Sequence, residues 1–424
     1  MAMYRPRLLV LSHALPFPMS SGQALRISYM LASLRERFHV TFGTVAPEEE
    51  RVEVTRQLRE RCDEAVVLPA LYPSSRVARI PHQLRGMAYQ ARTGLRRSNH
   101  VISRIEFTPE RVEAIVGKAS FDAVLYEYWH AAPSLSVFRK LGTPTILDMH
   151  NVLWRAYEAE MKLEPGIPAF LRNRLVNQYR RHEEAAWRDF DALVAINRDE
   201  FDYTRATVQP SKQVFYTPMG VDLERWPYGW KPASGPRVAY YGGMGAKRNQ
   251  EGALRVLRCV MPAVWQRFPN AEFWIVGGGP PESIRALTSN PLIKVSGFVK
   301  DLPPLLGTMS VVVCPFDGTY GFRSRMVEVL AIGVPSVCTP DAVAGMELVE
   351  RRAVLPAVTD EVLAQQTVQL LTSAAASEHQ SQHGRRTVED LFSVQNTYQR
   401  FAGDLAGWLV GRKESFGEVG CRIA

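Results

Sequence analysis

Two arginines and a glutamate, Arg323, Arg325 and Glu328, stand close together in the stretch GFRSRMVEVLAIGVPSV, residues 321–337. Guanidinium groups at this spacing repel each other unless an anion lies between them. A diphosphate meets that requirement, so both arginines are candidate catalytic groups that would stabilise it as a leaving group. Glu328 stands among apolar residues, where its carboxylate would accept hydrogen bonds from two hydroxyl groups, such as those of a ribose.

The secondary structure expected around this stretch would direct the arginines at an anion. An apolar strand is expected over 310–314, and Gly321 is expected to open a helix. Gly321 and Phe322 then belong to a helix N-terminus, where free N–H groups and the helix dipole favour an anion. The alternative is an Arg325–Glu328 ion pair on a surface helix, but the apolar flanks favour a buried helix.

Three further loops follow expected strands in the second half of the chain: YYGGMGAKRNQEG, IVGGGP and GFVKD. Glycines directly after a strand allow backbone to approach a ligand closely, and nearby cations could reach phosphate. The first loop lacks the G-x-G-x-x-G spacing of a dinucleotide site, so a plain turn is its alternative. The candidate binding residues in these loops are Gly243, Lys247, Arg248, Gly277, Phe298 and Val299.

The first half of the chain offers a glycine and two histidines at similar places. Gly22, in HALPFPMSSGQALR, is expected to open a helix and so to provide another anion-friendly end. His130 and His150 each follow an expected strand, over 122–128 and 144–149. A lone histidine is more often structural than functional, but its position at a strand end favours function.

Short apolar runs alternate with helical patterns along the whole chain. The runs expected as strands are 7–13, 39–45, 65–69, 122–128, 144–149, 192–196 and 213–217, then 237–241, 271–276, 293–296, 310–314 and 335–338. Strands rich in Val, Leu and Ile that alternate with helices predict parallel sheets covered on both faces. The fold class expected is therefore α/β, with two Rossmann-like, doubly wound domains and ligands in a cleft beyond the strand ends.

The 424 residues are too many for one core, and composition changes suggest where the domains divide. A first domain is expected over 1–218, and a proline- and glycine-rich linker over 219–236. A second domain would follow over 237–385, and an amphipathic terminal helix over 386–424. Within the first domain, 152–190 carries one long helical pattern.

Bulk composition excludes several classes of protein. No apolar run approaches the length of a transmembrane helix. The five cysteines are scattered without a C-x-x-C pair, which indicates reduced thiols in a cytosol and argues against a zinc site.

The net charge of +8 is unevenly distributed. Between Glu64 and Glu106 there are seven arginines and no acidic residue, and apolar side chains are interleaved with the arginines over 71–104. This segment is either a solvated basic face or a surface that docks on anionic lipid headgroups. Nucleic acid is not expected as a partner, since no helix-turn-helix, zinc-finger or RNP motif accompanies the charge.

Nearly the whole chain resembles the nucleotide-sugar glycosyltransferases of family 4, which have the GT-B fold. The stretches that carry the resemblance are PFPMSSGQALR, GGMGAKRNQEGALR, FPNAEFWIVGGGP, SGFVKDLPPLLGTMSVVVCPF and GFRSRMVEVLAIGVPSVCTP. The last is the most specific, because chance seldom produces the order R-x-R-x-x-E-x-x-x-x-G-x-P. The chain looks closest to the bacterial branch that builds exopolysaccharides, including sugar transferases of PEP-CTERM and exosortase systems.

The resemblance implies a role for each candidate residue. Arg323 and Arg325 would hold the donor diphosphate, Glu328 would bind the ribose, and the backbone near Phe298 and Val299 would cradle the base. In the first domain, Gly22 would close over the phosphates, and His130 or His150 would contact the transferred sugar. The terminal helix would cross back to the first domain.

Two positions depart from the family pattern. Many members carry a glutamate, used near the transferred sugar, where this chain has Tyr320, and Asp317 is a conceivable substitute. Members usually have lysine where Arg325 stands, and arginine keeps the charge while adding a bidentate grip on phosphate.

The sequence therefore predicts a glycosyltransferase that uses a nucleoside diphosphate sugar, such as a UDP- or GDP-sugar, and the resemblance to family 4 implies that it retains the configuration of the sugar. No D-x-D pair is found where a metal would bridge the diphosphate, so neither a metal nor a cofactor is expected. The acceptor would be a carbohydrate or a lipid-linked sugar. The location expected is cytoplasmic, either free or peripheral at the inner face of the plasma membrane. The alternatives are a nucleotide-sugar epimerase or hydrolase of the same fold, and a non-catalytic nucleotide-sugar binder.

Overall fold

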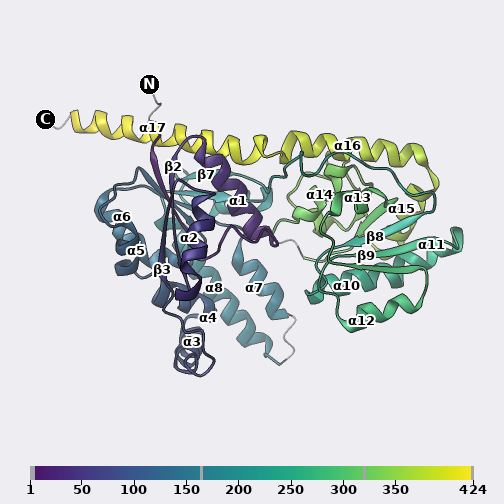
Figure 1. Ribbon diagram of the computed structural model, residues 1–424, viewed down its shortest axis with the longest axis horizontal. Coiled ribbons are helices and arrows are strands. Elements are labelled where there is room, and N and C mark those ends of the chain that lie inside the picture. Colours follow the sequence, from purple (N-terminus) through teal and green to yellow (C-terminus); the bar gives the residue numbers. More distant parts are fainter. Residues whose placement is uncertain (1–4, 163–165, 319–320, 422–424) are drawn as a thin grey trace. The chain divides into compact units, whose positions relative to one another are not determined.

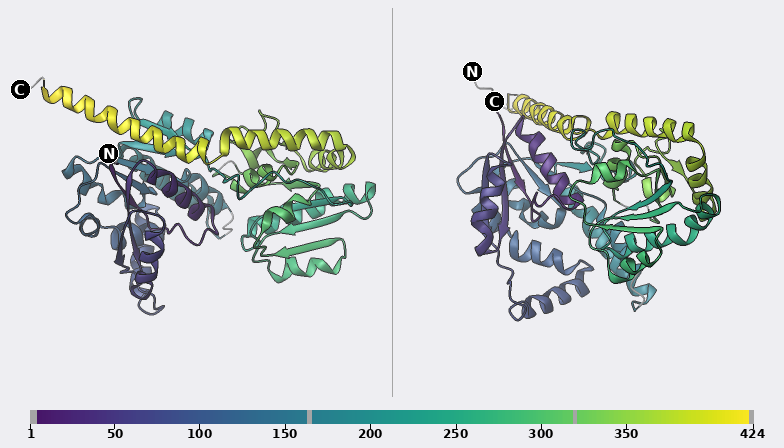
Figure 2. Two further views of the ribbon diagram at one scale, coloured as in Figure 1. Left: turned by 45° about the horizontal axis from the view of Figure 1, so that its top comes forward. Right: turned by 45° about the vertical axis from the view of Figure 1, so that its right-hand side comes forward.

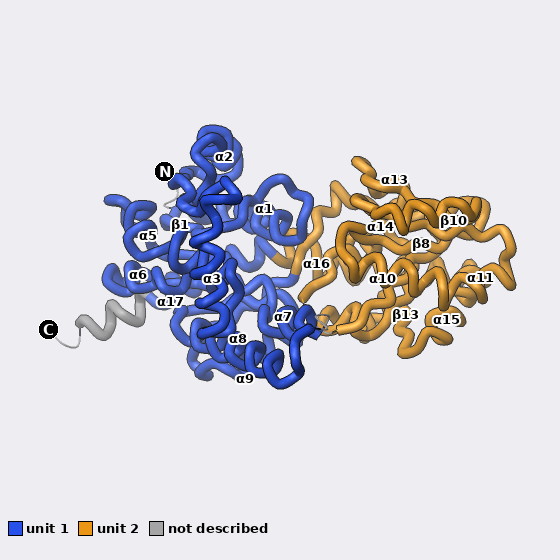
Figure 3. The backbone as a smooth tube through the Cα atoms, turned by 90° about the horizontal axis from the view of Figure 1, so that it is seen from below, with its two compact units in different colours: residues 1–218, 398–424 blue, residues 219–397 orange. Residues whose placement is uncertain are grey.

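The computed structural model describes residues 5–162, 166–318 and 321–421, without the side chains of 413–421. The chain forms two compact α/β units, which Figure 3 shows in different colours. Unit 1 comprises Met1–Pro218 and Tyr398–Ala424, and unit 2 comprises Met219–Thr397. Each unit is built around one parallel sheet with helices against it (Figure 1).

The sheet of unit 1 has the strand order β3-β2-β1-β4-β5-β6-β7, and its paired strands are parallel. The strands are β1 (Arg7–Leu11), β2 (His39–Ala46), β3 (Glu64–Pro69), β4 (Ala123–Glu127), β5 (Thr145–Asp148), β6 (Ala192–Ala195) and β7 (Gln213–Tyr216). All seven coincide with expected strands to within two residues at either end. The order reverses between β1 and β4, and the loops that follow these two strands therefore diverge to opposite faces of the sheet.

The described part of unit 1 contains more α-helices than the sequence indicated. They are α1 (Gly22–Arg35), α2 (Arg51–Arg59), α3 (Ile80–Thr93), α4 (Arg97–Val101), α5 (Pro109–Val116), α6 (Leu135–Leu141), α7 (Leu153–Lys162), α8 (Ala169–Asp189), α9 (Arg198–Thr207) and α17 (Arg400–Cys421). The single helix expected over 152–190 is wrong, because α7 and α8 are separate. Gly166 and Pro168 lie between them, and both residue types disfavour a continuous helix.

The sheet of unit 2 has the order β10-β9-β8-β11-β12-β13, again with parallel pairs. Its strands are β8 (Arg237–Tyr241), β9 (Glu272–Val276), β10 (Ile293–Gly297), β11 (Val311–Cys314), β12 (Ser336–Cys338) and β13 (Leu355–Pro356). Five of them match expected strands, whereas β13 is too short to produce an apolar run. The strand order reverses between β8 and β11, as it does between β1 and β4 in unit 1. Each of these places is called a switch point below.

The helices of unit 2 are α10 (Lys247–Arg255), α11 (Met261–Arg267), α12 (Glu282–Arg285), α13 (Leu302–Gly307), α14 (Ser324–Ile332), α15 (Asp360–Thr372) and α16 (Ala374–Phe392). The expectation that Gly321 opens a helix is wrong, since α14 begins at Ser324. Gly321 has φ of +71°, a left-handed conformation that does not start a right-handed helix. The terminal helix expected over 386–424 is likewise divided, because α16 ends at Phe392 and α17 begins at Arg400.

Helices lie against both faces of the sheet of unit 2 (Figure 2), and an apolar core fills the space on each face. Successive side chains of a strand point to opposite faces, so Val311 and Val313 enter one core while Val312 and Cys314 enter the other. One core also receives α14 and α16, and the other receives α10, α11 and α15. The sheet is therefore buried on both faces, as its continuous apolar strands predict.

The domain boundaries differ from the expected ones at two places. The segment 219–236 is not a free linker but part of unit 2, where Trp230 Nε1 donates to the Met309 carbonyl at 2.9 Å. The chain returns to unit 1 at Tyr398 instead of residue 386. From there, Phe401 packs edge-on against Phe215 of β7 with ring centroids 5.4 Å apart. Among the described residues, no helix is both long and apolar enough to span a bilayer.

Candidate functional site

In unit 2, chemically active side chains gather where the strand order reverses between β8 and β11. The loop after β8 and the segment that leads from β11 into α14 both start at the carboxyl edge of the sheet. In doubly wound folds this place binds ligands, because the diverging loops leave a crevice between them.

Arg325 is held at this switch point by contacts with β8 and α10. Its Nη1 donates to the Tyr241 carbonyl at 3.1 Å and to Asn249 Oδ1 at 2.9 Å. A Cβ atom on Gly242 would lie 2.0 Å from the same nitrogen, so only glycine leaves room for the guanidinium. Arg325 thus turns towards these elements and not towards Glu328, the partner in the alternative interpretation. Asn249 was not among the predicted residues, since its only signal in the sequence was its place beside Lys247 and Arg248.

The glycine-rich loops after β8 and β9 are joined through their backbones. Gly242 N donates to the Val276 carbonyl at 2.9 Å, and Met244 N donates to the Gly278 carbonyl at 2.8 Å. Gly277 has φ of +148°, and a Cβ there would lie 2.0 Å from the Gly242 carbonyl oxygen. In contrast, a Cβ on Gly243 would meet no atom within 4 Å. Gly243 therefore faces open space, while Gly242 and Gly277 are needed for packing.

Arg323 and Arg248 share one aromatic ring beside this loop. The guanidinium carbon of Arg323 lies 3.4 Å from the centroid of Phe316, and that of Arg248 lies 5.6 Å from it. Burial, together with the nearby charges of Arg325 and Arg248, lowers the pKa of Arg323 to about 10. The three arginines predicted to bind phosphate are therefore close together, and their mutual repulsion favours an anionic ligand. No pattern in the sequence predicted that Phe316 would contact these arginines.

Lys247 and Gly321 were also predicted to bind the phosphates. Lys247 is exposed at the first residue of α10. Gly321 precedes α14 by three residues and does not belong to the helix N-terminus. Tyr320, which replaces the family glutamate, lies outside the described residues. Asp317, the suggested substitute for that glutamate, instead accepts two hydrogen bonds from Arg255 Nη1, at 3.0 and 3.1 Å.

Glu328 lies in α14, where its Oε2 accepts a hydrogen bond from the Tyr241 hydroxyl at 2.7 Å. Burial raises the pKa of the Glu328 carboxyl. Phe322, predicted to be near the diphosphate, packs its ring edge-on against Phe392 at 5.7 Å and so contributes to the core. At the end of β10, Phe298 is 82% exposed and lies beside Gly278. Val299 follows it and is half-buried.

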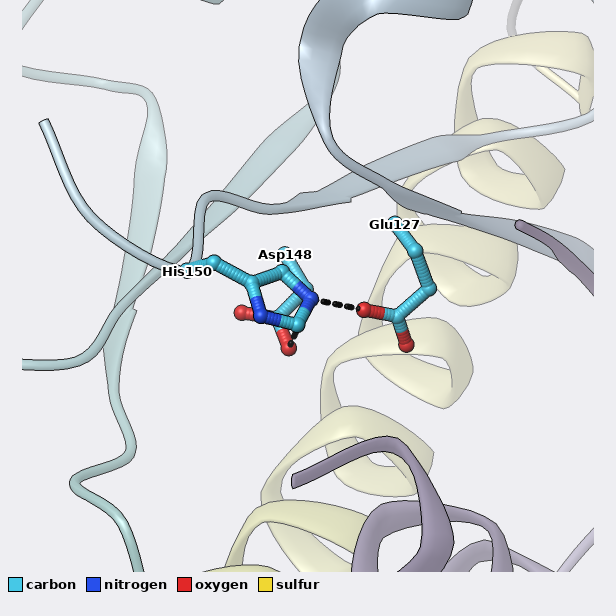
Figure 4. Close-up of side chains that lie close together, drawn as sticks. All are labelled: Glu127, Asp148 and His150. Atoms are coloured by element: carbon cyan, nitrogen blue, oxygen red, sulfur yellow. Dashed lines mark hydrogen bonds and ion pairs between the residues drawn. The ribbon is translucent and has the colours of Figure 1, made fainter. Parts of the chain in front are cut away.

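In unit 1, a buried network lies at the carboxyl ends of β4 and β5 (Figure 4). His150 Nε2 lies 2.5 Å from Glu127 Oε2, and all three side chains in the figure are buried. Arg26 of α1 binds Asp148 in a bidentate way, through Nε to Oδ2 and Nη2 to Oδ1, both at 2.7 Å. Burial disfavours the Asp148 carboxylate, but the Arg26 charge outweighs that effect and holds the pKa of Asp148 below its ordinary value.

Four aromatic rings form one cluster beside this network. Tyr128 stacks on His150 with centroids 4.1 Å apart and planes at 6°, and His130 stacks on Tyr128 at 5.7 Å. His13, which the sequence analysis did not select, lies 5.2 Å from Tyr128. Burial lowers the pKa of His13 to about 4 and that of His130 well below its ordinary value. Both imidazoles are therefore neutral at pH 7.

Backbone strain marks the same place. Tyr128 has φ of +72° and His150 has φ of +57°, conformations that are uncommon for residues with a side chain and that gather at functional sites. Both ring nitrogens of His130 are buried without a hydrogen-bond partner. Because unpaired buried polar atoms are costly, these nitrogens are suited to a ligand that supplies the missing hydrogen bonds.

Two further observations concern ligand binding in unit 1. Gly22 is the first residue of α1, as expected, and the Ser21 side chain caps the helix by accepting from Ala24 N at 3.2 Å. The ligand atoms of Glu127, Asp148 and His150 lie within 4.8 Å of one another, a spacing that suits a cation. However, both Asp148 oxygens already bind the Arg26 guanidinium, which supplies positive charge to the cluster.

Comparisons with known proteins identify part of the chain. Residues 235–373 match the family of glycosyl transferases group 1. No curated protein sequence matches the chain.

Solved structures match almost the whole chain. Sucrose-phosphate synthase from Thermosynechococcus elongatus is 17% identical, with a TM-score of 0.69, over 96% of this chain and 100% of that chain. A glycosyltransferase from Rickettsia africae is 13% identical, with a TM-score of 0.65, over 96% and 99%. HepE of Anabaena, solved with UDP and glucose, is 13% identical, with a TM-score of 0.59, over 95% and 100%. At such identities the likeness shows the GT-B fold alone.

Proposed function

We propose that this chain, with its glycosyl transferases group 1 domain, moves a sugar from a nucleoside diphosphate sugar to a carbohydrate or lipid-linked acceptor. The proposal includes retention of configuration, as in family 4, and a role in bacterial exopolysaccharide synthesis. The observation that carries the transfer reaction is the gathering of Arg248, Arg323 and Arg325 at the switch point of unit 2. Positive charges this close together favour an anion beside them.

The geometry suits the departure of a diphosphate. Transfer breaks the bond between the anomeric carbon of the sugar and the diphosphate oxygen, and a bond forms from that carbon to the acceptor hydroxyl, which loses its proton. Negative charge then develops on the departing oxygen. Arg323 and Arg325 are fixed beforehand by Phe316, Tyr241 and Asn249, so they stabilise this charge without reorganisation.

The remaining ligand groups follow from the same arrangement. Glu328 and Tyr241 form a hydrogen-bonded pair that would receive the ribose hydroxyls. The exposed ring of Phe298 offers a surface beside the base. Uridine is the first candidate base, because the related fold of Anabaena HepE was solved with UDP. Guanosine is the second, and the donor needs no cofactor or metal in this proposal.

The experiment for this function measures melting temperatures with UDP-, GDP- and ADP-sugars, followed by product analysis. A ligand that binds only the folded state stabilises it by about 2.7 kcal/mol at one hundred times its Kd. We expect stabilisation by one nucleotide class and sugar transfer to an added acceptor. Stabilisation without turnover would indicate a binder, and turnover of donor alone would indicate a hydrolase or epimerase. No stabilisation by any nucleotide sugar would refute the proposal.

We also propose that the chain works at the inner face of the plasma membrane, through the basic segment 71–104. Its helix α3 lies at the end of unit 1 away from the sheet (Figure 1). Ile80, Leu84 and Met87 are exposed by 50%, 60% and 49%, and their spacing puts them on one helical face. The arginines of the segment that are exposed are Arg76, Arg85, Arg92, Arg97 and Arg104. An apolar face with arginines around it suits anionic lipid headgroups.

Replacing Leu84 and Met87 with glutamate is expected to abolish binding to anionic vesicles. The change removes apolar area that would enter the lipid and adds negative charge that the headgroups repel. Each arginine near such a surface contributes about 1 kcal/mol of binding free energy, which the added charges would oppose. Co-sedimentation with phosphatidylglycerol vesicles measures it. The matched control is Val52→Glu, at a residue of α2 that is 84% exposed. The wild type should ignore neutral phosphatidylcholine vesicles, and failure to bind anionic ones would refute membrane docking.

A further inference from the structure

We propose that Glu127 is a positioning residue that keeps a proton on Nδ1 of His150, so that His150 meets the sugar as a hydrogen-bond donor. The role of the sugar in this inference rests on the proposed transfer reaction. The protonation of His150 does not, because it follows from the contacts and charges of unit 1 alone.

The ring of His150 is fixed from two directions. Glu127 is the last residue of β4 and pairs in register with Asp148, the last residue of β5, so the two strand ends are neighbours. From this edge Glu127 reaches Nε2 of His150 at 2.5 Å. The positive φ of His150 turns its ring onto Tyr128, where it stacks at 4.1 Å. Nδ1 is therefore the ring nitrogen that remains for a ligand.

The charges nearest to His150 determine how many protons it shares with Glu127. Arg26 and Asp148 are fully buried and cancel each other as a bidentate pair. If Glu127 were ionised and His150 neutral, one unpaired negative charge would remain in the buried cluster, which is costly. The cluster is balanced only when Glu127 and His150 together are neutral.

The other groups that face His150 do not change this balance. His13, from the loop after β1, and His130, after β4, are neutral because burial lowers the pKa of each. Burial raises the pKa of the Tyr128 hydroxyl, which is neutral as well. Burial, and after it the Asp148 charge, also raises the pKa of Glu127, which favours an additional proton in this pair.

A neutral Glu127–His150 pair leaves Nδ1 protonated in both of its favourable forms. In one form the carboxylate accepts from Nε2–H of an imidazolium, which also carries Nδ1–H. In the other form the carboxylic acid donates to Nε2, and the neutral imidazole carries its proton on Nδ1. A third neutral form, in which the carboxylic acid carries its proton on Oε1 and Oε2 accepts from Nε2–H, would bury that proton without an acceptor, because Oε1 has no hydrogen-bond partner among the described residues. The short contact joins the same two atoms in both favourable forms. The ligand therefore meets a donor, which suits a sugar oxygen that accepts a hydrogen bond.

The decisive experiment is ¹⁵N NMR of histidine-labelled protein at pH 7, with the His150 signals assigned by their loss in His150→Asn. We expect a protonated Nδ1 in the wild type. In Glu127→Gln the amide oxygen accepts from Nε2–H without any charge, so Nδ1 should lose its proton. A wild-type Nδ1 without a proton overturns the proposal, and so does an Nδ1 that stays protonated in Glu127→Gln. The wild-type spectrum decides even if the variant does not fold.

A second readout separates this role from a merely structural one. The activity of Glu127→Gln should recover as the pH falls, because solvent protons then restore Nδ1–H, whereas loss of structure would lower activity equally at every pH. The matched control is Glu183→Gln, which alters another fully buried carboxyl of unit 1, one that accepts from Leu153 N and Trp154 N. Its His150 spectrum should not change. Absence of transfer by the wild type would refute the proposed function and leave the NMR result standing.

Discussion

Arg325→Ala is expected to lower kcat for sugar transfer by about 10²–10³-fold, the range found when one preorganised oxyanion donor is removed. The guanidinium is already held at the switch point by the Tyr241 carbonyl and Asn249, so its charge acts where the diphosphate would depart. Nucleotide-sugar binding should weaken as well, because in the proposed reaction the arginine would also contact the diphosphate of the bound donor. Initial rates and melting temperatures with the donor measure both effects.

The control for Arg325→Ala is Arg285→Ala, which removes an exposed arginine of unit 2 that pairs with Glu282 three residues earlier. It should leave both kcat and donor affinity unchanged. If Arg325→Ala kept wild-type turnover, leaving-group stabilisation at the switch point would be excluded.

A neighbouring pair of glycines tests the same site by geometry. A methyl group on Gly242 would lie 2.0 Å from Nη1 of Arg325 and would displace the guanidinium, whereas one on Gly243 would meet open space within 4 Å. Gly242→Ala should therefore reproduce part of the Arg325→Ala defect. Gly243→Ala should preserve the position of Arg325, and any loss of donor binding in that variant would show that the ligand itself occupies the space beside Gly243.

Arg26→Met is expected to destabilise unit 1 by about 3–5 kcal/mol, the cost of leaving one partner of a buried ion pair without its counter-charge. Arg26 and Asp148 are both 0% exposed, and Arg26 Nη1 also donates to the Thr217 carbonyl at 2.9 Å. Urea unfolding measures the loss.

The double variant Arg26→Met/Asp148→Leu should recover much of this stability, because it removes the unpaired carboxylate together with its partner. Arg56→Met serves as the control, since Arg56 pairs with Glu53 on the exposed face of α2, and should give no measurable change. A small effect of Arg26→Met alone would mean that Asp148 takes up a proton or finds another partner in the folded protein.

Local sequence patterns predicted the sheets and the arginines but not the partners of those arginines. The apolar runs identify the strands because the central strands of both sheets are buried on both faces. The spacing of Arg323 and Arg325 is likewise a local signal. Asn249 and Phe316, in contrast, contact these arginines only because β8 and β11 are neighbours.

The network of unit 1 was hidden for a related reason. His130 and His150 were selected by their positions after strands. Glu127 stands within an apolar run, however, and Arg26 lies in a helix far from both histidines in sequence. Their contact depends on β4 and β5 being adjacent and on α1 lying against them. The break between α16 and α17 was missed as well. The short turn there does not interrupt the amphipathic pattern of apolar and polar residues, so that pattern predicted one helix.

The path of the chain has a consequence for synthesis on the ribosome. Unit 2 is one continuous segment, Met219–Thr397, whereas unit 1 is interrupted and receives its last helix only from Tyr398 onwards. Domains generally fold as units while the chain emerges. Unit 1 therefore cannot complete its fold until the whole of unit 2 has been synthesised, because Phe215 of β7 lacks its contacts with Phe401 and Trp408 until then. A chain truncated near residue 397 would consequently contain all of unit 2. Its unit 1 would lack the last helix and would be bound by chaperones or degraded by proteases.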